Sequence, residues 1–132
     1  MSAAEAMQCQ IERDGFCVVE GVIPAGEVQA ISGELLAVIE RASVLVAPDT
    51  GPAHMGTTVG TPVVGLYAAS NPLRSGPYLS LDHTVNNYAE ALQAERGARE
   101  DEVRWGTRVR GKAAMETITL DQVIEKLEAI LG

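Results

Sequence analysis

Six consecutive residues of this sequence have the chemical types that bind a negatively charged ligand: Asp49-Thr50-Gly51-Pro52-Ala53-His54. They directly follow an apolar run, and Pro52 takes an early helical position, where a missing N–H costs nothing. The first turn of a helix has unpaired N–H groups and a partial positive charge, and Gly51 lets a phosphate approach without a Cβ in the way. The segment therefore predicts a diphosphate site at the start of a helix.

The polar side chains of this segment suggest separate roles. Thr50 offers a hydroxyl donor. Asp49 would repel a phosphate, so its carboxylate is expected to accept hydrogen bonds from sugar hydroxyls or loop amides; the alternative is that Asp49 only caps the helix. His54, one turn into the helix, is either a catalytic or ligand-facing imidazole or, more commonly, a packed or surface side chain.

A second candidate is Arg74, which lies in the loop expected over residues 68–78. Loops at the ends of strands carry the ligand contacts of many α/β proteins. A guanidinium pairs well with phosphate oxygens, so Arg74 is either a phosphate clamp or an ordinary surface arginine.

Strands and helices of alternating type must hold these residues. Val44–Ala47 and Pro62–Tyr67 are continuous apolar runs, typical of strands covered on both faces of a parallel sheet. From Pro24 to about Arg41, apolar residues at steps of three and four predict an amphipathic helix. They are Val28, Ile31, Leu35, Val38 and Ile39. A layered α/β fold follows.

The remaining segments give simpler patterns. Residues 3–13 predict a short helix and residues 16–19 a strand, while polar residues 88–102 predict a solvated, partly helical surface. The final helix begins at Thr119, with Gln122 reaching back as in a capping box, and its apolar stripe should pack against the sheet.

Composition excludes several classes of protein. The net charge of −8 makes nucleic acid an unexpected partner. No apolar stretch approaches the roughly 20 residues of a membrane span, so a cytoplasmic location is expected. Cys9 and Cys17 lack ligand-spaced companions and are expected to be reduced thiols. No metal and no cofactor is expected.

The Asp49–His54 segment and the following Gly60-Thr61-Pro62-Val63-Val64-Gly65-Leu66-Tyr67 resemble family 9 glycosyltransferases, the bacterial heptosyltransferases. The resemblance extends upstream to Gly33 and downstream through the Ser70–Tyr78 loop and Arg104-Trp105-Gly106-Thr107, where Trp105 would anchor the tail. It covers about residues 33–132.

That resemblance implies the C-terminal half of a GT-B donor domain, with a partial Rossmann-like, three-layer parallel sheet. It implies a nucleotide-sugar donor such as ADP-heptose, with Thr50, Gly51 and Pro52 at the diphosphate and Asp49 and His54 toward the sugar. The family's acceptor lobe and catalytic base have no counterpart here, so no catalytic residue is assigned. A complementing acceptor-lobe chain or self-association, as a packing module, is the expected partnership.

Residues 1–32 are expected to have a different origin from residues 33–132. Asp14–Pro24 resembles the N-terminus of phytanoyl-CoA dioxygenase-like proteins, but His54 and His83 lack the His-x-Asp pattern of an iron site. We expect residues 16–41 to supply a strand and a helix that begin the α/β fold.

Overall fold

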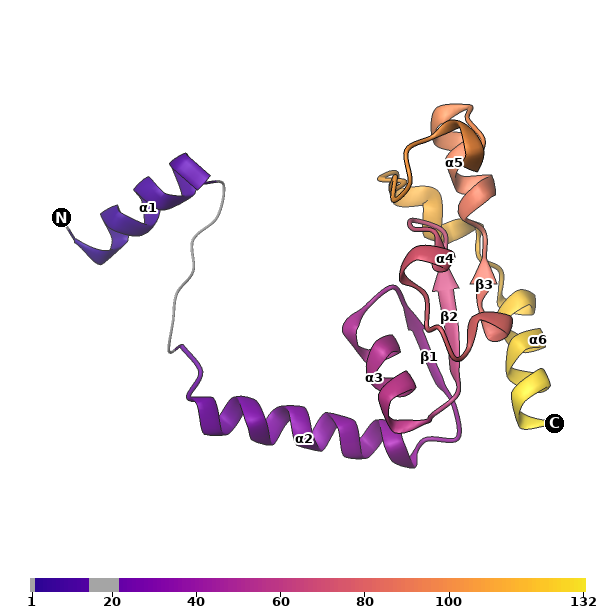
Figure 1. The fold of residues 1–132 in the computed structure, drawn as a ribbon, viewed down its shortest axis with the longest axis horizontal. Coiled ribbons are helices and arrows are strands. Elements are labelled where there is room, and N and C mark those ends of the chain that lie inside the picture. Colours follow the sequence, from indigo (N-terminus) through magenta and orange to yellow (C-terminus); the bar gives the residue numbers. More distant parts are fainter. Residues whose placement is uncertain (1, 15–21) are drawn as a thin grey trace. The chain divides into compact units, whose positions relative to one another are not determined.

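The computed structural model describes residues 2–14 and 22–132 (Figure 1). The helices are α1 (Ala3–Asp14), α2 (Ala25–Arg41), α3 (Gly51–Val59), α4 (Pro72–Ser75), α5 (Tyr88–Arg96) and α6 (Leu120–Leu131). The strands are β1 (Leu45–Pro48), β2 (Val63–Tyr67) and β3 (Val85–Asn86). Short 3₁₀ turns lie at Leu81–His83, Glu100–Glu102 and Lys112–Thr117. The strand expected over residues 16–19 and the position of Cys17 lie outside the described residues.

The chain divides into two compact units, Met1–Gly33 and Glu34–Gly132. The first contains α1, where the exposed Cys9 is a free thiol, and the beginning of α2. The second contains the whole sheet and every candidate site residue. None of the described helices is both long and apolar enough to cross a membrane.

The sheet of the larger unit is parallel, with the strand order β1-β2-β3. Leu45 of β1 pairs with Val63 of β2, and Leu66 of β2 pairs with Val85 of β3. The expected mixed α/β fold with a partial Rossmann-like parallel sheet is therefore confirmed. β3 was not predicted, because two residues are too short to show a strand pattern.

Helices α3 and α6 flank this sheet (Figure 1). Ala53 of α3 is fully buried with Ala47 and Val63 from the two strands, and Leu45 packs against them. Gly56 is needed for this close approach, since a Cβ there would lie 2.6 Å from Val63 Cγ2. α6 contacts β2 and β3, and its start carries the expected capping box of Thr119 and Gln122.

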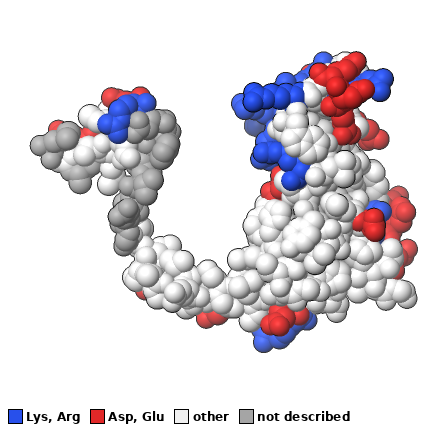
Figure 2. Space-filling view, viewed as in Figure 1, with Lys and Arg blue, Asp and Glu red and all other residues white. Residues whose placement is uncertain are grey.

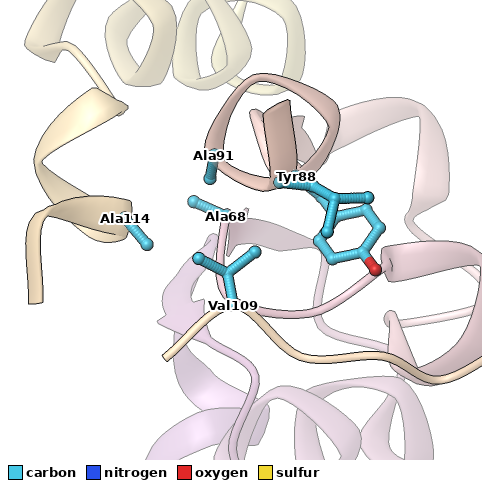
Figure 3. Close-up of a cluster of buried hydrophobic side chains, with 6 residues drawn as sticks. Ala68, Tyr88, Ala91, Val109 and Ala114 are labelled. Carbon is cyan, nitrogen blue, oxygen red and sulfur yellow. The ribbon is translucent and has the colours of Figure 1, made fainter. Parts of the chain in front are cut away.

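A second core cluster lies where the chain after β2 meets α5 and the C-terminal tail. Ala68, Tyr88, Ala91, Val109 and Ala114 point toward one another there (Figure 3), together with Leu92. The Tyr88 hydroxyl donates to the carbonyl oxygen of Thr107 at 2.7 Å, and the Val109 N–H donates to the Ala69 carbonyl at 2.9 Å. These contacts fix the tail beside the carboxyl end of β2.

One expectation about burial is wrong, and the predicted amphipathic helix α2 has a largely exposed apolar face. In β1 the side chain of Val46 is 42 % exposed, because α3 covers only the face that carries Leu45 and Ala47. The apolar stripe of α2 is also exposed except at Ile39, which lies in the larger unit beside the buried Thr61. Periodicity predicts that a face is apolar, not that a partner covers it.

Candidate functional site

The corner between β1 and α3 has the backbone geometry of an open helix start. Thr50 is the N-cap residue, with extended backbone, and Pro52 lies in the first turn as expected. The Thr50 hydroxyl does not cap the helix; it donates to the carbonyl oxygen of Pro48 at 3.2 Å. The first turn of α3 therefore begins without a side-chain acceptor.

This corner is accessible from solvent. Thr50 and Gly51 are exposed, and nothing lies within 4 Å of the position that a Cβ of Gly51 would occupy. Within residues 22–132 of the described chain, no protein acceptor is found for the Gly51 N–H. An incoming oxyanion could thus receive a hydrogen bond from this amide without displacing a side chain.

Asp49 joins this corner to the loop that follows β2. Its Oδ2 accepts hydrogen bonds from Ser70 Oγ at 2.7 Å and from Ser75 Oγ at 3.0 Å. The Asp49 side chain is only 19 % exposed. The alternative that Asp49 merely caps α3 is wrong, because Thr50 occupies that position and the carboxylate points toward the two serines.

Tyr67, at the end of β2, is hydrogen-bonded to the same loop. Its hydroxyl donates to the carbonyl oxygen of Ser75 at 3.0 Å. Burial, and then the negative charge of Asp49, raise the pKa of Tyr67 to about 12. The phenol therefore stays neutral at physiological pH and remains a hydrogen-bond donor.

Arg74 and His54 extend the site in different directions. Arg74, in α4, is exposed and lies over the backbone of Gly106, where a Cβ would come within 2.9 Å of Arg74 Nε. Gly106 also has a φ of 84°, so glycine is favoured at this position for two reasons. His54 is exposed on the first turn of α3. Their roles toward a ligand stay predictions.

A cavity of about 310 Å³ is lined by Asn71, Tyr88, Trp105 and Gly106 among others. The corner residues Asp49, Thr50 and Gly51 do not line it, and they do not line a larger cavity of about 870 Å³ beside α5. Trp105 is 67 % exposed, so it does not pack in the core of the described residues, and its role as an anchor of the tail stays a prediction. The corner is an open surface rather than an enclosed pocket.

The structure brings Asp49 together with the loop that follows β2, so the two segments that the sequence selected separately meet at this carboxylate. The sequence did not single out Ser70, Ser75 or Tyr67. The two serines belong to the loop that was expected to bind ligand, but their shared acceptor is a tertiary contact without a local pattern. No group of three or more His, Cys, Asp or Glu side chains that could hold a metal ion occurs within the described residues.

Comparison with known proteins gives a consistent result. The family model described as Glycosyltransferase family 9 (heptosyltransferase) matches residues 32–105. The chain is also 43 % identical, over 97 residues, to the lipopolysaccharide core heptosyltransferase OpsX of Haemophilus influenzae. That match covers 74 % of this chain but only 28 % of the relative, so the chain spans little more than a quarter of its length. No solved structure matches significantly.

Proposed function

This chain belongs to glycosyltransferase family 9, and we propose that its Glu34–Gly132 unit binds the diphosphate of an ADP-sugar donor at the start of α3. The observation that carries this proposal is the exposed, uncapped turn at Thr50 and Gly51. The Gly51 N–H can donate one hydrogen bond to an oxyanion, and the Thr50 hydroxyl can donate a second by leaving the Pro48 carbonyl. Pro52 has no N–H, and the Ala53 N–H already donates to the Thr50 carbonyl. The sugar would be a heptose used in lipopolysaccharide core assembly, as the name of the relative indicates, and the binding would take place in the cytoplasm.

Asp49 fits a role toward the sugar in this proposal. Among the described residues, the hydroxyls of Ser70 and Ser75 and the guanidinium of Arg108 all approach Asp49 Oδ2. Asp49 Oδ1 is then the oxygen that accepts a hydrogen bond from a sugar hydroxyl. His54 lies one turn further along α3. Arg74 would approach the phosphates from α4.

We further propose that these residues bind the donor without transferring the sugar by themselves. The matched segment corresponds to 28 % of the relative, and no base for an acceptor hydroxyl is assigned within it. Transfer would then need an acceptor lobe and a base that lie outside the matched segment.

Titration with ADP, followed by backbone amide NMR, tests the binding proposal. We expect the largest shifts at Thr50 and Gly51, and we expect Gly51→Val to weaken ADP binding by about tenfold or more, since the branched side chain fills the approach to the amides. The space around Gly51 is empty of protein, so this variant should fold normally.

The matched control is Gly33→Val, which adds the same side chain at another glycine with nothing within 4 Å of its Cβ position. This control should bind ADP like the parent chain. Absence of shifts at Thr50 and Gly51 with millimolar ADP would refute the proposed function.

A second candidate is a packing or oligomerisation module, and exposed apolar surface favours it. Val46 is exposed on the edge strand β1, and Leu35 and Val38 are exposed on α2. An open edge of this kind can pair with another chain. Sedimentation separates the candidates: a monomer that binds ADP supports the donor site, whereas a dimer that ignores ADP supports the module.

A further inference from the structure

The C-terminal tail carries a basic side chain to the β1–α3 corner from far along the sequence. The Val109 N–H donates to the Ala69 carbonyl, and Val109 is buried at 5 % exposure in the cluster around Tyr88. These two contacts hold the backbone on the C-terminal side of Arg108, which places the Arg108 guanidinium beside Asp49. Its position is therefore set by the core.

The contact between Arg108 and Asp49 is loose. Arg108 Nη2 lies 3.9 Å from Asp49 Oδ2, which is beyond hydrogen-bond distance, and the Arg108 side chain is 56 % exposed. Asp49 Oδ2 already accepts two short hydrogen bonds from Ser70 and Ser75. Asp49 thus leaves the N–H donors of Arg108 available to another acceptor.

This arrangement removes an electrostatic obstacle to anion binding. A lone carboxylate at residue 49 would repel a phosphate at Thr50 and Gly51. The Arg108 guanidinium lies 3.9 Å from this carboxylate, so its positive charge offsets the repulsion that Asp49 exerts on a nearby anion. Figure 2 shows Lys and Arg side chains at the end of the larger unit toward which the strands point, with Asp and Glu side chains beside them.

We propose that Arg108 is a further donor-binding residue, whose guanidinium binds the phosphate oxygens of the donor at the β1–α3 corner. The inference rests on the proposed function, because it assigns a residue to the same site. Arginine suits this role, since its planar N–H groups can bind two phosphate oxygens at once while Asp49 stays paired with the serines.

Calorimetric titration of the full chain with ADP and with inorganic pyrophosphate tests this assignment. We expect Arg108→Gln to weaken the binding of both ligands by about tenfold to a hundredfold, which is the range for loss of a charge-assisted hydrogen bond. The loss of affinity between low and high salt should also become smaller, because one charge has been removed from the site. Arg108→Lys should fall between the parent and Arg108→Gln.

The control is Arg110→Gln, which removes the same charge from an exposed position two residues away. It should leave both affinities close to those of the parent. Thermal unfolding of every variant is measured alongside, and Arg108→Lys keeps the assignment testable if Arg108→Gln does not fold.

The outcomes separate the two proposals. If the parent binds ADP and Arg108→Gln binds it equally well, Arg108 has no role at the phosphates and the proposed function stands. If Arg110→Gln loses as much affinity as Arg108→Gln, the effect is one of general charge and the assignment is wrong. If the parent binds neither ligand, both proposals are refuted.

Discussion

Burial and the nearby charge of Asp49 together keep the Tyr67 hydroxyl protonated. Tyr67 is 1 % exposed, and burial together with the charge of Asp49 raises its pKa to about 12 from an ordinary value of 10.0. The unfolded chain ionises this tyrosine at about pH 10, whereas the folded chain resists ionisation until about pH 12. The stability that Tyr67 contributes is therefore complete below pH 10 and is lost as the pH rises through 12.

Replacing Tyr67 with phenylalanine should remove this part of the alkaline destabilisation. We expect the free energy of unfolding to fall less between pH 8 and pH 11 in Tyr67→Phe than in the parent chain. At pH 8 the variant should lose about 1 kcal/mol through the missing hydrogen bond to Ser75. Denaturant unfolding at both pH values measures this, and an identical fall in both proteins would contradict the assignment.

Arg108 shows why the site could be predicted only in part at the level of residues. Asp49, Thr50 and Gly51 follow a strand directly, so local sequence is enough to select them. Arg108 and the serines reach Asp49 from 21 to 59 positions away along the chain, through loops whose course depends on the core around Tyr88 and Val109. Nothing in the tail's own sequence marks Arg108 out from its neighbouring arginines.

At the scale of elements, the contact of α3 with the sheet depends on one glycine. Gly56→Ala would place a Cβ 2.6 Å from Val63 Cγ2 and 3.2 Å from Leu45 Cδ2. Overpacking of this kind costs about 1–3 kcal/mol, which exceeds the gain of about 1 kcal/mol in helix propensity. We expect a net loss of stability, with the sheet and helix forced slightly apart.

Chemical denaturation measures this loss, and a second substitution isolates its cause. Adding Val63→Ala to Gly56→Ala removes the clashing methyl group, so the pair should cost less than the sum of the two single changes. Strict additivity would show that the Gly56–Val63 contact is not what limits the packing. Gly33→Ala, at an open helical position, should not destabilise the chain.

The elements that sequence predicts well are those with a complete local signal. β2 and the start of α6 are of this kind, since an unbroken apolar run and a capping box each specify the structure within a few residues. β3 has two residues, and its pairing with Leu66 and Tyr67 is set by β2. The stripe of α2 is the opposite case, because its pattern is clear but Val28, Ile31, Leu35 and Val38 are each more than a third exposed.

At the scale of the whole molecule, the two core clusters belong to the Glu34–Gly132 unit. We therefore expect residues 34–132 alone to keep a cooperative thermal transition close to that of the full chain. Circular dichroism of the two proteins measures this. Loss of the transition would instead favour our sequence-based expectation that residues 16–41 supply elements the fold requires.

The exposed Trp105 is an intrinsic fluorescence probe. It is the single tryptophan of the chain, it is 67 % exposed, and the adjacent Gly106 backbone lies beneath Arg74. Excitation of indole therefore reads out one location, next to the tail that carries Arg108. Changes in its emission therefore report on the surroundings of Trp105 alone, in unlabelled protein.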